Sequence, residues 1–339
     1  MSEGLGFRLD ARVSALPRKA LPDNLPIQFF ETATIECQID STPAIRGVAS
    51  SWNNISKSDS GALNVVINDK YYFLHYFHCV EIIIGVYVFW QEFLPRFVPT
   101  HIYFGEQEWN NPNQNDVQKH LLSTCFPLAS IIEGPSIGTA IELRNVLYVD
   151  RSRAKTDINK FLDPLFPIAS IWGRQFTRSV TGHSQIRTAT AKLRAGYVRR
   201  TPPRCLSQSA EEALFACIVA SGYEITIVDF ATISFPEQIL VCCSFDLLVG
   251  MHGNGLTNLL WLPDRAIVIE LFPPEAHAYD YQMLAEIRGV PYFGVDGAGN
   301  RFYRDWTRVG PVYGTFQQPL TALSNASLFA LTRFLICPR

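Results

Sequence analysis

The sequence predicts an α/β protein of two domains, the second of which is a doubly wound parallel sheet flanked by helices. With 339 residues, the chain is long enough for two domains with ordinary buried cores. Strand-like apolar runs alternate with helix-length segments along most of it. A polar stretch without helical or strand period, from Arg174 to Ala195, separates two such regions and is the best linker candidate.

The composition is that of a folded protein, with 47% hydrophobic and 18% charged residues. The formal net charge is −2, so no global basic field exists to hold a phosphate backbone, and nucleic acid is not an expected partner. The first thirty residues contain no long apolar run, and the longest run in the chain, Ile82 to Trp90, is too short to span a bilayer. We therefore expect neither a signal-peptide core nor a membrane span in this chain.

The N-terminal half divides into an arm and a first domain. Residues 1–60 are rich in Pro, Ser and Asp and are predicted to form an irregular arm. Residues 61–185 are predicted to form the first α/β domain. The elements expected there are strands at 62–67, 101–104 and 145–150 and a helix at 75–94.

The second domain, predicted at 186–339, has the clearest pattern. Its expected strands are 196–200, 223–230, 245–250, 266–272 and 290–295, and its expected helices are 209–221, 235–243, 256–262 and 279–289. Strands this apolar, separated by helix-length segments, are buried on both faces of a parallel sheet.

The most informative motif is the turn MHGNGLTN, residues 251–258, which follows one of these strands. Ligands of such sheets bind outside the carboxyl ends of the strands. Glycines allow positive φ and close backbone approach, and a helix that opens near Leu256 directs N–H groups and a positive dipole end at the same place. We expect a diphosphate there. The predicted contacts are Gly250, His252, Gly253, Asn254, Gly255, Leu256 and Thr257, with His252 adding a hydrogen bond or a positive charge.

Two further features extend this predicted nucleotide site. Glu270 is expected at the carboxyl edge of the next strand, where it would accept hydrogen bonds from two ribose hydroxyls. Arg199, Arg200 and Arg204 follow the first strand of the domain and suit the charge of a leaving diphosphate. Glycine-rich turns also occur merely as tight turns, and clustered arginines are often only solvated, so these alternatives stay open.

In the first domain, His75, His78 and Glu81 recur at intervals of three residues and would share one helix face. They would form a metal site, an acid/base pair, or polar groups among aromatic neighbours, and a metal is the least expected of these. No Asp-x-Asp triplet occurs in the sequence. Because sugar transferases that use a metal commonly hold the donor diphosphate through such a pair, a metal-free transferase is favoured.

The block SFPEQILVCCSFDLLVGMHGNGLTNLLWLPDRAIVIELFP, residues 234–273, resembles the signature of the family 61 glycosyltransferases. This family includes EGF-domain O-GlcNAc transferases and plant xylan xylosyl- and arabinosyltransferases. The stretch from Gly196 to Phe230 looks like the strand and arginine-bearing loop that precede the signature. HYFHCVEIIIGVYVFW, from His75, resembles a motif in the N-terminal half of the family.

The resemblance implies a GT-B fold of two Rossmann-like domains and an inverting transferase that uses a UDP-sugar as donor and no cofactor. The sugar would be GlcNAc or a pentose such as xylose, moved to a protein or glycan hydroxyl held chiefly by the N-terminal domain. The catalytic candidates are His78, Glu81 and His252, without a metal. The family's compartment implies the lumen of the ER or Golgi.

Two other interpretations remain. GNGLTN followed by Glu270 imitates the dinucleotide fingerprint of an NAD(P) oxidoreductase, although Asn258 stands where that fingerprint has its third glycine. A non-catalytic nucleotide- or glycan-binding descendant would keep the same fold without the activity.

Overall fold

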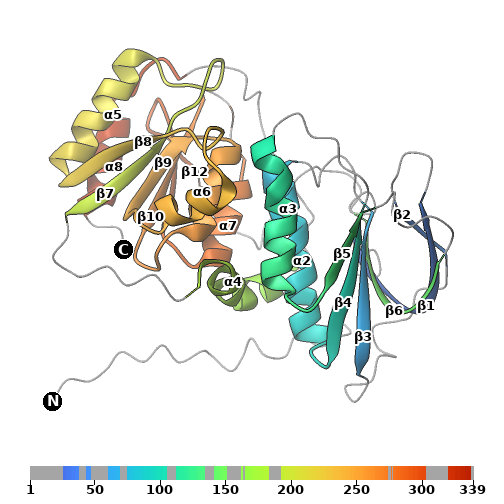
Figure 1. Ribbon diagram of the computed structural model, residues 1–339. Coiled ribbons are helices and arrows are strands. Elements are labelled where there is room, and N and C mark those ends of the chain that lie inside the picture. Colours follow the sequence, from blue (N-terminus) through green and yellow to red (C-terminus); the bar gives the residue numbers. More distant parts are fainter. Residues whose placement is uncertain are drawn as a thin grey trace, which may run out of the picture. The chain divides into compact units, whose positions relative to one another are not determined.

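The computed structural model describes residues 26–37, 43–46, 60–68, 75–104, 112–133, 141–150, 162, 165–182, 192–273, 276, 278–302 and 320–336. Contacts between residues divide the chain into two compact units. The first comprises Met1–Tyr71, Ile84–Glu106 and Leu128–Ile171, and the second comprises Tyr72–Ile83, Gln107–Pro127 and Trp172–Arg339. Each unit is a mixed α/β structure with a sheet rich in parallel strands (Figure 1).

The sheet of the first unit has the strand order β2-β1-β6-β3-β4-β5. Its strands are β1 (Ile27–Cys37), β2 (Pro43–Arg46), β3 (Gly61–Ile67), β4 (Phe97–Phe104), β5 (Ser130–Glu133) and β6 (Ile141–Val149). Strands β6, β3, β4 and β5 pair in parallel, whereas β1 and β2 are antiparallel additions.

The expectation of an irregular arm over residues 1–60 is wrong for β1 and β2, which lie within it. β1 pairs with β6 from Ile27 to Ile35 and buries Phe29, Phe30 and Ala33. Its apolar residues form only short runs interrupted by polar residues, so the sequence pattern alone is weak. The antiparallel pairing with β6 stabilises the strand in the folded protein.

Among the described residues, the helices that precede the second sheet are α2 (Tyr76–Phe93), α3 (Pro112–Cys125) and α4 (Phe166–Thr181). The helix predicted at 75–94 is confirmed as α2. The predicted linker from Arg174 to Ala195 is wrong over Arg174–Thr181, which forms the second half of α4. The buried residues Ile168, Phe176 and Val180 follow a helical period. The predicted linker begins at Arg174, in the middle of the helix. Neither half of the helix is long enough on its own to show the period.

The second sheet has the order β12-β11-β10-β9-β7-β8. Its strands are β7 (Leu193–Val198), β8 (Tyr223–Val228), β9 (Leu247–Met251), β10 (Ile267–Phe272), β11 (Tyr292–Asp296) and the antiparallel β12 (Arg301–Phe302). Its helices are α5 (Gln208–Ala220), α6 (Phe235–Cys242), the 3-10 helix η5 (Asn254–Trp261), α7 (Asp280–Arg288) and α8 (Asn325–Ile336). All the strands and helices predicted between residues 196 and 295 are present, although the helix after the glycine turn is a 3-10 helix.

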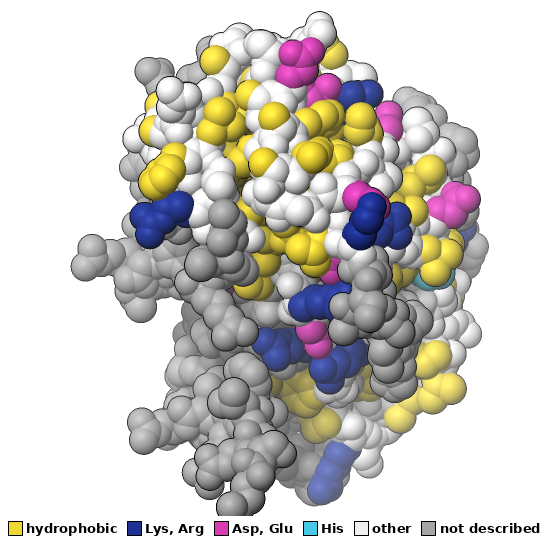
Figure 2. All heavy atoms as spheres, turned by 90° about the vertical axis from the view of Figure 1, so that its left-hand side faces the viewer, with side chains coloured by type: hydrophobic (Ala, Val, Ile, Leu, Met, Phe, Trp, Pro, Cys, Tyr) yellow, Lys and Arg dark blue, Asp and Glu magenta, His cyan; other side chains and the backbone are white. Residues whose placement is uncertain are grey.

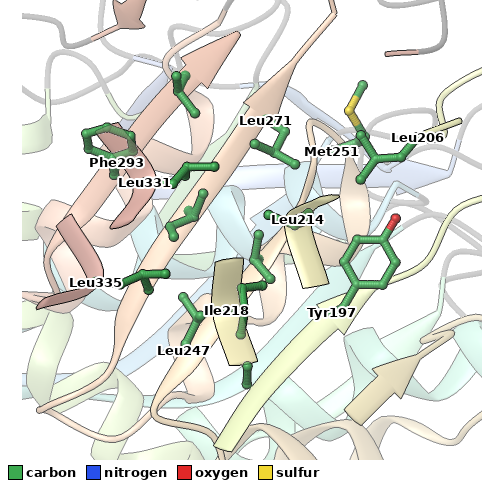
Figure 3. Packing of buried hydrophobic residues seen from close by; sticks show 14 of the residues in the cluster. Tyr197, Leu206, Leu214, Ile218, Leu247, Met251, Leu271, Phe293, Leu331 and Leu335 are labelled. Carbon is green, nitrogen blue, oxygen red and sulfur yellow. The ribbon is translucent and has the colours of Figure 1, made fainter. Parts of the chain in front are cut away.

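Helices cover both faces of this sheet. Odd-numbered residues of the central strands, including Tyr197, Val249 and Leu271, pack against Leu214 of α5 and Leu331 of α8 (Figure 3). Because side chains alternate along a strand, the even-numbered residues face the other side. Helices α6 and α7 lie on that side (Figure 1), and both contact η5. This is the arrangement of a doubly wound sheet.

The order of the strands places a reversal between β7 and β9. From β7 the chain passes through α5 to β8 on one side, and then through α6 to β9 on the other side of β7. In an open α/β sheet, ligands bind outside the carboxyl ends of the strands at such a switch point. The glycine turn begins at the end of β9, beside this point.

Two properties of the described surface bear on partners. No helix among the described residues is long and apolar enough to cross a membrane. On the face shown in Figure 2, Lys and Arg side chains lie among Asp and Glu side chains and hydrophobic patches. The charge on this face is therefore mixed in sign.

Candidate functional site

A pocket of about 240 Å³ opens at the switch point of the second unit. Arg199 and Arg200, which follow β7, form part of its wall. Asp229 and Phe230 contribute from the end of β8, and Asn254 and Gly255 contribute from the turn after β9. The three loops meet at the carboxyl edge of the sheet, where a doubly wound domain binds its ligand.

The glycines of the turn allow close approach to β7 and to the loop that follows it. Gly253 has φ +148°, and a Cβ atom there would lie 1.2 Å from Nη1 of Arg200. Cβ atoms at Gly250 and Gly255 would lie 2.9 Å and 2.6 Å from side-chain atoms of Val198. Only Gly253 among these three has a positive φ, so Gly250 and Gly255 serve packing rather than an unusual backbone conformation.

Arg200 is the guanidinium that packs on this turn. Its Nη1 donates a hydrogen bond of 2.6 Å to the carbonyl oxygen of His252. Burial lowers the pKa of Arg200 from its ordinary value, but an arginine so placed keeps its charge. Arg199 is held instead by Glu211 of α5, at 3.1 Å. Arg204 is outside the set of residues that line the pocket.

The start of α2 belongs to the same unit and reaches the turn. The Tyr76 hydroxyl donates to Oδ1 of Asn258 at 3.0 Å and accepts from Nε1 of Trp261 at 2.8 Å. His75 Nε2 lies 2.9 Å from Nδ2 of Asn254. The aromatic-His motif of the N-terminal half and the glycine turn are thus joined by side-chain hydrogen bonds.

His78 and Glu81 share a helix face as predicted. Nδ1 of His78 lies 3.1 Å from Oε2 of Glu81, and both side chains are buried. Neither lines the pocket. Among the residues that the structure describes, no three His, Cys, Asp or Glu side chains gather as metal ligands. The structure therefore shows a hydrogen-bonded pair at these positions, and its role in chemistry stays a prediction.

Glu270 is not where the sequence placed it. It lies inside β10, which continues to Phe272, and its side chain is 0% exposed. One carboxylate oxygen lies 2.6 Å from Nδ1 of His252, and the other accepts a hydrogen bond of 2.5 Å from the Tyr292 hydroxyl. Burial and the charge of Glu270 hold the pKa of Tyr292 well above its usual range, so Tyr292 remains a donor. Glu270 thus orients His252 and is closed to a ribose.

The other predicted contacts are divided between the pocket and the core. His252 is buried, with its ring beside those of Phe272 and Tyr281. Leu256 and Thr257 are fully buried and do not line the pocket. Of the predicted phosphate contacts, Asn254 and Gly255 line it together with Arg199 and Arg200.

Sequence reasoning missed several lining residues, namely Tyr76, Asp229, Phe230, Gln238 and Asn258. Asp229 and Phe230 directly follow β8, so the strand-end rule that singled out the glycine turn applies to them equally. Gln238 and Tyr76 lie on helices, and although Tyr76 belongs to the motif that begins at His75, no local pattern marks either residue as part of a pocket. Their proximity to the pocket depends on tertiary packing.

Comparison with known proteins identifies the family. The family model described as Glycosyltransferase 61 matches residues 86–269, more than half of the chain. The chain belongs to this glycosyltransferase family. The resemblance seen in the signature block is therefore confirmed.

Among similar proteins is the EGF domain-specific O-linked N-acetylglucosamine transferase of Xenopus laevis, 32% identical over 117 residues, which are 34% of this chain and 22% of that protein. The protein of the same name from Drosophila melanogaster is 38% identical over 103 residues, which are 30% of this chain and 19% of that protein. The chain thus spans about a fifth of the length of these relatives.

Proposed function

We propose that this chain transfers a sugar from a UDP-sugar to a hydroxyl group of a protein or glycan, with inversion at the sugar carbon. The two α/β units would be the two Rossmann-like domains of a GT-B enzyme, with the nucleotide on the second. Family membership supports the reaction class. The doubly wound sheet of the second unit, with its pocket at the switch point, supports the nucleotide site.

The observation that carries the proposal is the position of Arg200 on Gly253 at the pocket. A guanidinium has five N–H donors, and the His252 carbonyl takes one of them. The remaining donors suit the oxygens of a diphosphate, whose charge grows as the sugar leaves. Glu270 and Tyr292 support this arrangement by holding the His252 side chain. Such a site neutralises the leaving group without a metal.

The base that activates the acceptor hydroxyl is proposed to be His78. An inverting transfer needs one base near that hydroxyl. Glu81, buried against Nδ1 of His78, would orient the ring and stabilise its protonated form, as a carboxylate does for a catalytic imidazole. His252 is proposed only to position the turn.

The names of the relatives support GlcNAc as the first sugar to test, and a protein such as an EGF domain as the first acceptor. A pentose such as xylose is the second choice. The compartment proposed for this reaction is the ER or Golgi lumen.

A hydrolysis screen tests the proposal. The protein is incubated with UDP-GlcNAc, UDP-xylose and UDP-arabinose, each with EDTA and with manganese, and released UDP is measured. We expect release from one donor, unchanged by EDTA, and its loss in Arg200→Ala. Release that stops in EDTA and returns with manganese would contradict the metal-free site. No release from any donor, with UDP bound normally, would favour a non-catalytic descendant.

A further inference from the structure

The pocket carries a carboxylate that the proposed chemistry does not use. Among the described residues that line it, Asp229 is the only acid. Asp229 directly follows β8, the strand next to β7 at the switch point, and its side chain is exposed. It is therefore open to a ligand, in contrast to Glu270, whose carboxylate is buried and already bonded.

The Asp229 side chain is fixed by a local turn. Its Oδ1 accepts a hydrogen bond of 3.0 Å from the backbone N–H of Ala231, and its carbonyl accepts one of 2.9 Å from the Thr232 hydroxyl. A carboxylate has about four acceptor positions, and this turn occupies one of them. The side chain is thus held in place with most of its acceptor capacity unused by the described residues.

A second polar side chain, that of Gln238, lies on the same side of the pocket. Nε2 of Gln238 donates to the carbonyls of Phe230 at 2.9 Å and Ile233 at 3.2 Å. Both amide hydrogens are therefore used, and the amide cannot turn over without setting two carbonyls against its oxygen. Oε1 is buried and has no hydrogen-bond partner among the described residues. Because Oε1 is buried, it is the exposed Asp229 carboxylate that makes this side a place for ligand groups that donate hydrogen bonds.

The charges of the pocket set the direction of the ligand. A phosphate next to the Asp229 carboxylate would be repelled, whereas the Arg200 guanidinium attracts it. Neutral hydroxyls have the opposite preference, because an ionised carboxylate is a strong acceptor. Among the parts of a nucleoside diphosphate, the vicinal diol of the ribose matches the Asp229 side.

We propose that Asp229 accepts hydrogen bonds from the two ribose hydroxyls of the donor nucleotide, with the diphosphate directed toward Arg200. This inference rests on the proposed function and assigns the ribose to a residue that sequence analysis passed over. An acid at the carboxyl end of a strand beside the phosphate turn holds the ribose in other doubly wound nucleotide domains.

The test is a calorimetric titration of the full chain with UDP, 2′-deoxy-UDP and 3′-deoxy-UDP. The variant is Asp229→Asn, which keeps an oxygen for the Ala231 N–H and so preserves the turn. Glu224→Gln is the matched control, because it removes the same charge from the other end of β8, where Glu224 pairs with Lys192. UDP lacks the sugar that would be transferred, so the hydroxyls under test are those of the ribose.

We expect Asp229→Asn to weaken UDP binding at least tenfold and Glu224→Gln to leave it within about twofold. Each deoxy analogue should bind more weakly than UDP to the natural protein, and this loss should largely vanish in Asp229→Asn. Equal or tighter UDP binding by Asp229→Asn would overturn the assignment and leave the proposed function standing. Absence of UDP binding by the natural protein would overturn both.

Discussion

Glu270 shows how the environment of one residue decides its role. Its carboxylate lies on the even-numbered face of β10 and bonds His252 and Tyr292, both of which reach it from neighbouring segments. The acid and its position after the glycine turn are visible in the sequence. Its burial is not, because the partners of a side chain in a parallel sheet come from other segments of the chain.

Replacement of Glu270 by Gln should lower stability rather than remove a ribose contact. The variant exchanges two charge-assisted hydrogen bonds for neutral ones at a fully buried site, which costs about 1–3 kcal/mol of unfolding free energy. The check is a pair of measurements on one variant, the unfolding midpoint and the UDP affinity of the folded fraction. Tyr292→Phe, which removes one donor to the same carboxylate, should lower the midpoint as well. A tenfold loss of UDP affinity with an unchanged midpoint would return the ribose role to Glu270.

Substitution of the single residue Gly253 tests the proposed phosphate site. Gly253→Ala requires an alanine at positive φ and drives its Cβ into Nη1 of Arg200. Gly222→Ala also places alanine at positive φ, at +91°, but its Cβ would meet nothing within 4 Å. Both variants should therefore lose on the order of 1 kcal/mol of stability from the backbone. Only Gly253→Ala should also weaken UDP binding, by tenfold or more.

Calorimetric titration of both variants with UDP gives the comparison. If the two retained equal affinity for UDP, the packing of Arg200 on the turn would be irrelevant to phosphate binding.

At the scale of elements, the sequence predicted most of the second sheet. Its strands are continuous apolar runs bounded by turn residues, and that signal is local. Where the structure differs from the prediction, contacts with residues distant in sequence are the cause. The helix after the turn is 3-10, and its first residues Asn254 and Gly255 lie against His75 and Val198. β1 was missed because its partner β6 lies more than a hundred residues away in sequence.

The link between the start of α2 and η5 can be tested by substitution of Tyr76. The hydroxyl of Tyr76 receives the Trp261 N–H and donates to Asn258, so it ties α2 to η5. Tyr76→Phe would leave a buried donor and a buried acceptor without partners, which should cost about 1–3 kcal/mol. Tyr223→Phe is the control, since Tyr223 is buried in the same unit and its hydroxyl has no hydrogen bond among the described residues. Chemical denaturation of both measures the difference. Equal stability of the two variants would show that this link contributes nothing.

At the scale of the molecule, the family was readable from one block of forty residues, whereas the composition of the pocket was not. The signature block contributes Gln238, Asn254, Gly255 and Asn258 to the lining. The remaining lining comes from the end of β7, from the loops after β7 and β8, and from Tyr76, far away in sequence. Contacts also group Tyr72–Ile83 and Gln107–Pro127, which the sequence analysis assigned to the first domain, with the second unit. A local sequence pattern cannot predict contacts between segments so distant along the chain.

The central claim is that the pocket at the switch point binds a uridine diphosphate, and thermal unfolding in the presence of UDP or NAD tests it most directly. A ligand that binds only the native state stabilises it, by about 2.7 kcal/mol at a hundred times its Kd. We predict that the unfolding temperature rises with UDP concentration in the natural protein, rises much less in Arg200→Ala, and does not change with NAD. A rise with NAD and none with UDP would contradict the account.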